Sequence, residues 1–220
     1  MKRKDWLLLI DKQKGRSWNY CVNNFVFDQK SILARSPDTP QNILNELSKD
    51  GNSYRSNYIK IFVARNSNTS IKTLASLAKC SDRSVLIAVI KNKNTPAAVL
   101  ENFHLKKDVE VLCTLAKNHK TPITVLEKLS RSKNKEVRRA LAENRKTPAT
   151  ILEKCSRSSD YNVQLALAKH KKSTPKILTA LSKSKHDAIK KLVVKNKKTP
   201  KEVLFAMTVI DSSVANALAA

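Results

Sequence analysis

The pentapeptide Asn-Lys-Asn-Thr-Pro at residues 92–96 recurs along the chain in the form Asn-x-x-Thr-Pro. Further copies begin at Asn118, Asn144 and Asn196, so the interval is 26 residues or twice that. A weaker copy begins at Asn66, and His170 stands where one more Asn is expected. A motif that returns at a constant short interval is typical of a stack of similar units, each burying its apolar face on its neighbours. The sequence therefore predicts a repeat protein.

Each repeat is expected to contain two short helices. Thr followed by Pro favours a helix start, because the Thr hydroxyl can cap a free backbone N–H while Pro suits the first helical position. At Thr199 the capping box is completed by Glu202. A second helix should start thirteen residues after the Thr and end at the repeated Asn, which tolerates the left-handed conformation that closes helices. The expected second N-caps are Asp82, Asp108, Asn134 and Asp160.

Apolar residues follow both helix starts with helical spacing. In the first helix of one repeat these are Val125, Leu126 and Leu129. The second helix carries a Val three residues after its N-cap in successive repeats: Val85, Val111, Val137 and Val163. One face of each helix is therefore expected to be buried.

Composition supports an all-helical chain with an anionic partner. Only 2 Gly occur in 220 residues, and the 7 Pro lie mostly in the repeated motif, which disfavours β-rich and disordered classes. The net charge is +25, far more than solubility needs, so a polyanion is the expected partner. No export signal or membrane span is recognisable, and we expect a cytoplasmic protein, or a nuclear one in a eukaryote.

The two ends of the chain differ from the array between them. Residues 1–38 are expected to form N-terminal capping helices, and residues 39–220 about six repeats plus a terminal helix. The first step is 30 residues long, which places a four-residue insertion near residues 50–55. After Glu202 the only charged residue is Asp211, so the apolar C-terminal helix either caps a monomer or pairs two chains end to end.

Cysteine and histidine are scattered. Cys21, Cys80, Cys113 and Cys155 form no Cys-x-x-Cys pair, and Cys155 stands where other repeats have Leu129. They are interpreted as small core residues, and neither a metal site nor a cofactor is expected.

The unit Val-x-x-x-Leu-Ala-x-Asn-x-x-Thr-Pro-x-x-x-Leu, found at residues 137–152, resembles the leucine-rich repeat variant family. The resemblance covers residues 56–204 clearly and 29–55 loosely. It implies a right-handed superhelical, HEAT-like solenoid of alternating α- and 3₁₀-helices. A known member carries an iron–sulfur cluster in a Cys-rich N-terminal segment, but this chain has only Cys21 there, so no cluster is expected. The family has no established common function.

Residues in register form columns, and the columns around the repeated Asn are basic. Taking one residue before each Asn or His and two after, the six copies contain 24 residues with a summed charge of +12. We predict that this basic edge binds phosphate. Its cations are Arg65, Lys91, Lys93, Lys117, Lys120, Arg145, Lys146, Lys169, Lys171, Lys172, Lys195, Lys197 and Lys198.

Three functions are compatible with these features. The preferred one is a non-enzymatic nucleic-acid-binding protein that grips the phosphate backbone, with DNA or RNA and duplex or single strand left open. A scaffold for an acidic protein is the alternative. A DNA-base-acting enzyme of the short-helical-repeat glycosylase type is the third, with Asp50, Asp82 or Asp108 as its candidates, although the last two fit N-caps and we expect no enzyme.

Aromatic residues gather in the N-terminal part: Trp6, Trp18, Tyr20, Phe25, Phe27, Tyr54, Tyr58 and Phe62. They could stack on bases or seal the first repeat, and packing is the preferred interpretation.

Overall fold

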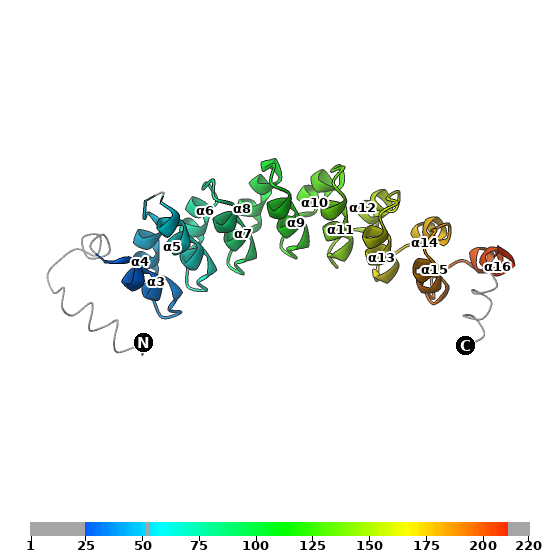
Figure 1. The fold of residues 1–220 in the computed structure, drawn as a ribbon, viewed down its shortest axis with the longest axis horizontal. Helices are drawn as coiled ribbons and strands as arrows, with labels where there is room; N and C mark the ends of the chain where they lie inside the picture. The colour runs from blue at the N-terminus through cyan, green and yellow to red at the C-terminus, as the bar shows by residue number, and fades with distance from the viewer. Residues whose placement is uncertain (1–24, 52, 211–220) are drawn as a thin grey trace. The chain divides into compact units, whose positions relative to one another are not determined.

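The computed structural model describes residues 25–51 and 53–210. Fourteen α-helices and one 3₁₀-helix occur in these ranges, which contain no strand (Figure 1). The all-α class predicted from the sequence is confirmed. The contacts divide the chain into unit 1, Met1–Asn102, and unit 2, Phe103–Ala220, which are described separately. No helix in the described ranges is both long and apolar enough to cross a bilayer.

Unit 1 stacks its helices in two layers. The second helices of successive repeats are α3 (Phe27–Arg35), α5 (Tyr54–Arg65) and α7 (Arg83–Lys91), and each packs on the next. The first helices are α4 (Gln41–Ser48), α6 (Ile71–Leu77) and α8 (Ala97–Glu101), of which α4 packs on α6. The repeat thus gives a layer of second helices beside a layer of first helices.

Unit 2 has the same two layers. Its second helices are α9 (Val109–Lys117), α11 (Lys135–Glu143), α13 (Tyr161–Lys169) and α15 (Asp187–Val194), each in contact with the next. Its first helices are α10 (Ile123–Ser130), α12 (Ala149–Cys155), α14 (Pro175–Ser182) and α16 (Lys201–Ile210), again in contact in order. The 3₁₀-helix η1 (Asn102–Leu105) starts at the boundary of the units. The predicted repeat solenoid is present.

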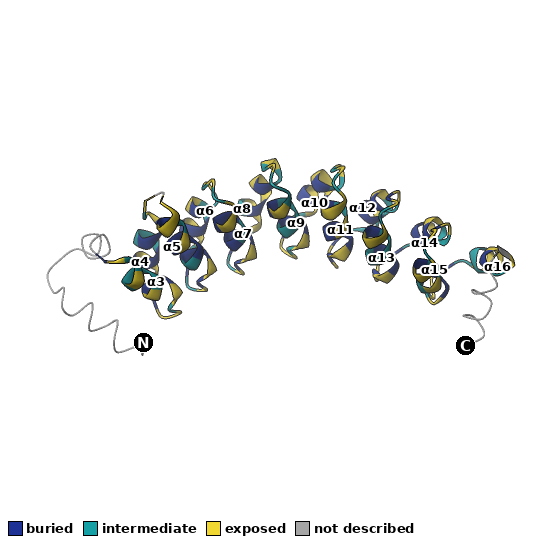
Figure 2. Ribbon diagram, in the orientation of Figure 1, coloured by how far each residue is buried: buried dark blue, intermediate teal, exposed yellow. Residues whose placement is uncertain are grey.

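The core of each unit lies between its layers, where Figure 2 shows buried residues on the helix faces that meet. The predicted column Val85, Val111, Val137 and Val163 is completely buried. The first helices add Leu126, Leu152 and Leu178, all with no exposed surface. Burying each such side chain stabilises the fold by about 1.5–3 kcal/mol, so the apolar periodicity accounts for the pairing of the layers.

The predicted N-caps of the second helices are confirmed. The Asp82 carboxylate accepts a hydrogen bond from the Val85 N–H at 3.0 Å. Asp108, Asn134 and Asp160 each accept bonds from two N–H groups at the starts of α9, α11 and α13. A side-chain acceptor at this position satisfies donors that the first helical turn leaves free.

The predicted role of Thr in the motif is wrong for most repeats. Helices α4, α8, α10 and α12 have Pro, not Thr, at the N-cap, with no side-chain capping bond. The Thr hydroxyl instead donates backwards to the carbonyl six residues earlier, as from Thr147 to Leu141 at 2.7 Å. The Thr199 hydroxyl likewise donates to Val193, at 2.5 Å, although Thr199 was predicted to form a capping box with Glu202. These Thr residues are buried, and their hydroxyls satisfy carbonyls at the end of the preceding helix that would otherwise lack a donor.

Thr174 is the exception that has the expected geometry. It is the N-cap of α14, its hydroxyl accepts the Ile177 N–H at 3.4 Å, and Pro175 is the first helical residue. In this repeat the motif is slipped by one residue, so Ser173 makes the backward bond, to Leu167 at 2.5 Å. The residue after the backward-bonding Thr or Ser thus caps the helix when it is Thr174 or Ser70, and gives no side-chain cap when it is Pro.

The predicted left-handed conformation of the repeated Asn is also wrong. Asn66, Asn92 and Asn144 have φ of -68°, -69° and -81°, all in the extended region. Each amide reaches into the preceding repeat instead. The Asn92 Nδ2 donates to the carbonyls of Ala64 and Asn66 at 2.7 and 2.9 Å. We call this contact the asparagine bridge.

The alternation of α- and 3₁₀-helices implied by the family resemblance is not found. Both helices of each repeat are α-helical, and η1 is the single 3₁₀-helix in the described ranges. Most of these helices contain seven to ten residues, long enough for several bonds of the i to i−4 type. The right-handed superhelical path stays an expectation.

The ends of the chain fall partly outside the described residues. Trp6, Trp18, Tyr20 and Cys21 lie there, as does the apolar segment 211–220, so the terminal cap and end-to-end pairing stay predictions. Helix α3 packs on α5 as later second helices pack on each other. The predicted insertion coincides with a longer helix, because α5 has 12 residues where α7 has 9.

The asparagine bridge should dominate the stability of each junction between repeats. Asn144 is buried, and its Nδ2 donates to Ala116 and Asn118 at 2.6 and 3.3 Å. We expect Asn144→Ala to lower the free energy of unfolding by about 2–4 kcal/mol, because buried carbonyls lose their donor. Urea denaturation measures this change.

The control is Asn162→Ala, at an exposed asparagine of α13. Surface substitutions of this kind usually stay within about 0.5 kcal/mol. A cost for Asn144→Ala no larger than that of the control would contradict the role given to the bridge.

Candidate nucleic-acid interface

The basic edge consists of the turns that follow the second helices. In unit 2 the turn residues, from one before each repeated Asn or His to two after it, are 117–120, 143–146, 169–172 and 195–198. Their formal charges are +2, +1, +3 and +3, a total of +9 in 16 residues. These turns contain ten of the predicted phosphate ligands, and all ten side chains are exposed.

The same side-chain acceptor shapes each of these turns. The Oδ1 of Asn118, Asn144 and Asn196 accepts the N–H of the second residue after it, at 2.8, 2.9 and 3.0 Å. That residue is Lys120, Lys146 or Lys198. Asn that bonds its own backbone two residues on forms a compact turn. This shared turn gives the three lysines the same local backbone conformation.

Neighbouring turns of unit 2 lie within reach of one lysine side chain. The Nζ of Lys172 is 3.4 Å from the Lys146 carbonyl oxygen, 26 residues earlier. The Nζ of Lys198 donates to the Lys171 carbonyl at 3.0 Å. The last three turns therefore form a continuous cationic surface, not separate patches.

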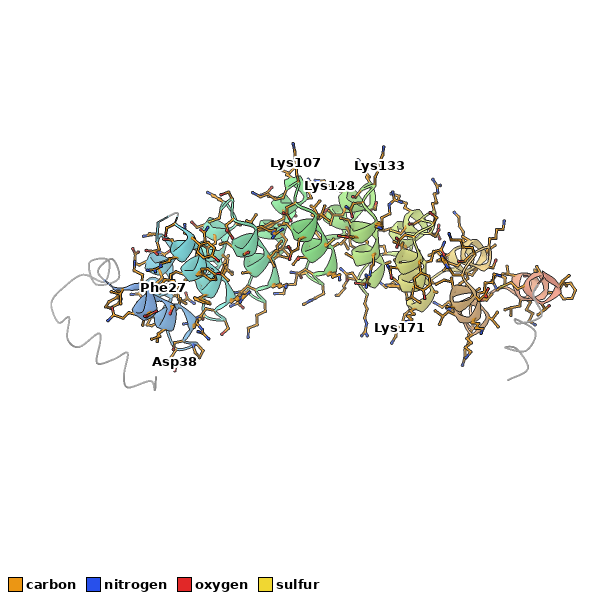
Figure 3. All side chains as sticks on the ribbon, in the orientation of Figure 1. Phe27, Asp38, Lys107, Lys128, Lys133 and Lys171 are labelled. Carbon is orange, nitrogen blue, oxygen red and sulfur yellow. The ribbon has the colours of Figure 1, made fainter. Side chains whose placement is uncertain are left out.

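The opposite edge of unit 2 is closer to neutral. It also carries lysines, and Figure 3 shows Lys107 and Lys133 on the side away from Lys171. Its turns contain carboxylates, however, and Asp160 and Asp187 lie 4.0 and 3.5 Å from the Nζ of Lys135 and Lys190. The charge of unit 2 is thus concentrated on the basic edge.

The three remaining predicted ligands, Arg65, Lys91 and Lys93, belong to unit 1 and are exposed there. In unit 1 the second residue after the repeated Asn is another Asn, not Lys. The Asn68 and Asn94 amides donate to the Thr39 and Ser67 carbonyls of the preceding turn, at 2.8 and 2.6 Å. The edge of unit 1 is therefore built from amides, with fewer cations.

Glu143 is the one carboxylate within the four basic turns of unit 2. Lys117 and Arg139 contact it at 2.8 and 2.6 Å. Partial burial alone would raise the pKa of Glu143, but hydrogen bonds from these two cations lower it below the ordinary value. Lys117 is therefore partly neutralised.

His170 replaces Asn in the third basic turn and keeps most of its contacts. The Lys172 N–H donates to Nδ1 at 3.0 Å, so the proton of the neutral ring is on Nε2, which lies 3.2 Å from the Asn144 carbonyl oxygen. Burial lowers the pKa of His170, the hydrogen bond to the Asn144 carbonyl partly offsets this, and the charge of Lys172 lowers the pKa further. A neutral imidazole is thus part of the fold.

Two hollows open beside the basic edge. A groove of about 350 Å³ runs between α11 and α13, with the cations Arg139, Arg145, Lys169 and Lys171 around Leu165 and Ala166. A second, of about 520 Å³, is lined by the turns at residues 117–119 and 143–146. Cations around partly apolar floors suit phosphate esters whose remaining atoms are flat or apolar.

A solved structure has a similar fold. It is described as a leucine-rich repeat variant with a novel repetitive protein structural motif. The match covers 88% of this chain and 82% of that one, with a TM-score of 0.60 and 19% identity. This chain has the leucine-rich repeat variant fold. No protein-family model and no curated protein matches the sequence.

Two residues of the candidate interface were not identified from the sequence. Arg139 and Asn162 line the groove from the exposed sides of α11 and α13. Their position could have been found by helical spacing, because Arg139 lies four residues before Glu143, one turn away on the same face.

The carboxylates proposed for an enzyme have structural partners in this fold. Asp82 and Asp108 cap α7 and α9, and Asp82 also accepts the Asn57 amide at 3.1 Å. Asp50 pairs with Lys30 at 2.6 Å. Within the described ranges no three His, Cys, Asp or Glu side chains gather as a metal site would require.

Cys155 occupies the core position predicted for it. It is buried, and burial raises the pKa of its thiol to about 11. Burial also raises the pKa of Cys113. Thiols with raised pKa are poor nucleophiles at neutral pH.

The buried His170 makes the stability of the fold depend on pH. Because the folded pKa lies below the ordinary 6.5, the unfolded chain takes up the proton first. Stability should be full above pH 6.5 and fall as pH drops towards the folded pKa. Denaturation of wild type and His170→Asn between about pH 5 and 8 tests this.

We expect His170→Asn to lose that pH-dependent decrease and to gain about 0.5–1.5 kcal/mol, because an amide can bridge two carbonyls. The other histidines are unchanged and cancel in the comparison. Equal pH dependence in both proteins would show that His170 is not the titrating group.

Proposed function

We propose that this protein binds nucleic acid, without catalysis, by gripping the sugar-phosphate backbone along the basic edge of unit 2. The supporting observation is the set of four turns with ten exposed cations and one carboxylate within the described part of that unit. Like charges this close repel each other, and a bound polyanion removes that penalty.

The spacing of the turns suits a phosphate chain. Packed helices lie roughly 8–10 Å apart, so successive turns meet a strand every two to three phosphates at about 3.4 Å of axis per charge. The observed reach of Lys172 and Lys198 to the preceding turn agrees with such a step. Helix α10 starts beside this edge, and Pro122 gives it no side-chain cap, which leaves N–H groups for an anion.

Binding of this kind has little sequence specificity. Lysine contacts to phosphate fix the position of a protein on the chain without reading the bases. Lysine predominates over arginine on the edge, with Arg145 as the arginine among its ten cations in unit 2. A compact ammonium on a flexible stem suits phosphates of varied geometry.

An acidic protein is the second candidate ligand for the same edge. Charge complementarity alone does not separate it from nucleic acid, since both present closely spaced anions. Recovery of bound material after nuclease treatment separates them. Loss of the bound material on nuclease treatment supports nucleic acid, and retention of an acidic protein favours the alternative.

The proposal predicts that charge reversal on the basic edge weakens binding. The variant carries Glu at Lys171, Lys172, Lys197 and Lys198, all exposed. Affinity for an oligonucleotide should fall about a hundredfold or more at physiological salt. The slope of log K against log salt should fall by about 4, one for each lost phosphate contact. Fluorescence anisotropy at several salt concentrations measures both.

A matched control reverses Lys107, Lys133, Lys183 and Lys185, which are exposed in the opposite turns of the same unit. It changes the net charge by the same amount, so any general electrostatic effect is shared. Equal losses in the two variants, or none in either, would contradict the proposal.

A further inference from the structure

Helix α5 exposes aromatic rings that the packing of unit 1 does not use. Tyr54 is 75% exposed and Tyr58 38% exposed, whereas Phe25 is buried. The preferred interpretation from the sequence, that these aromatics pack, does not account for the largely exposed ring of Tyr54. The rings of the two tyrosines meet edge to face with centroids 4.9 Å apart, and their hydroxyl oxygens are 2.7 Å apart. The pair is held in one arrangement at the surface.

Phe62 extends the tyrosine pair into a row. Residues 54, 58 and 62 are four apart, so they lie on one side of the helix. The Tyr58 and Phe62 centroids are 6.5 Å apart. The Arg35 guanidinium of α3 lies 5.3 Å from the centre of the Phe62 ring. We call Tyr54, Tyr58 and Phe62 the aromatic row.

The row has cationic surroundings. Figure 3 labels Phe27 on α3, and the Arg55 guanidinium lies 6.0 Å from the centre of that ring. Helices α3 and α5 together have a net charge of +4, with Asp28 as their one acidic residue. Just outside these helices, Asp50 forms an ion pair with Lys30. Aromatic rings beside arginines attract flat anionic ligands more than apolar ones.

Residues equivalent to Tyr58 and Phe62 in a later repeat line a groove. Tyr58 and Phe62 precede Asn162 and Ala166 by 104 residues, which is four repeat steps. Asn162 and Ala166 line the cationic groove between α11 and α13 of unit 2. The same face of the repeat thus carries aromatics with arginines in one unit and a groove with four cations in the other. The aromatic rings suit the base of a nucleotide, and the cationic groove suits its phosphate.

Among nucleic acids, only unpaired strands offer what this row can bind. In a duplex the faces of the bases are covered by their neighbours, and proteins read groove edges and phosphates. In a single strand each base has a free face that can stack on Tyr or Phe. We propose that the aromatic row binds unpaired bases, so that single-stranded nucleic acid is the preferred ligand. The proposal rests on the proposed function and specifies its ligand.

The test compares three ligands of equal length: oligo(dT), an abasic oligomer with the same phosphate chain, and a blunt duplex. The variant is Tyr54→Ala with Tyr58→Ala. Its affinity for oligo(dT) should fall about 10- to 100-fold, as expected for lost stacking. Its affinity for the abasic oligomer and the duplex should not change. Titrations by fluorescence anisotropy give all three values.

Two controls accompany the variant. Tyr54→Phe with Tyr58→Phe keeps the rings and should keep the affinity for oligo(dT). Tyr161→Ala removes a tyrosine of unit 2 that is also 38% exposed but packs on His186, with centroids 4.9 Å apart, and should leave all three affinities unchanged. Photo-cross-linking of wild type to a 4-thiothymidine oligomer, followed by mass spectrometry, should label α5 whether or not the Ala variant folds.

The outcomes separate the two proposals. An unchanged affinity of the Ala variant for oligo(dT), an equal loss for the abasic oligomer, or cross-links confined to other helices would overturn the aromatic row alone. If wild type binds none of the three ligands, the proposed function fails and the aromatic row fails with it.

Discussion

The asparagine bridge is the contact on which the other features of this fold depend. A buried amide at the end of one second helix donates to two carbonyls of the preceding repeat, as Asn92 and Asn144 show. Its oxygen accepts the N–H that shapes the following turn. Leaving such buried groups without partners costs about 1–3 kcal/mol each. The bridge therefore fixes both the register of neighbouring repeats and the form of the turn between them.

Because the repeats are in register, residues at equivalent positions of the sequence lie next to each other on the surface. Because the turn bond from the Asn oxygen recurs, the residue two after the Asn has the same local backbone environment at Asn118, Asn144 and Asn196. When that residue is Lys, as in unit 2, the lysines line up, and when it is Asn, as in unit 1, an amide links the turns instead. This position supplies four of the ten cations of the edge in unit 2. Our proposal of backbone binding rests on this column together with the other six cations of the same turns.

The repeat, the helix pairs and the core could be predicted from the sequence because they depend on spacing alone. The valine column and the Asp and Asn caps needed only helical periodicity and known capping preferences. The roles of Thr and of the repeated Asn could not be found in this way. The Thr hydroxyl bonds to the helix that precedes its turn, and the Asn amide bonds to carbonyls of the preceding repeat. A rule for helix starts considers only the helix that follows.

The candidate site could likewise be predicted from the sequence only in part. That cations recur around the Asn is visible in the sequence, and the described turns bring them together in unit 2. The pairing of Lys117 with Glu143 and the groove beside Leu165 depend on contacts between helices a repeat apart. The exposure of Tyr54 follows from a 12-residue helix where the repeat predicts a shorter one. Such features need the packed structure.

Hydrogen exchange of backbone amides, measured with and without a bound oligonucleotide, shows which turns of unit 2 the nucleic acid contacts. We expect slower exchange in the turns at residues 117–120, 143–146, 169–172 and 195–198, with the turns around Lys107 and Lys133 unchanged. Protection confined to those opposite turns, or no protection in unit 2 at a saturating concentration of a ligand that binds, would contradict binding along the basic edge.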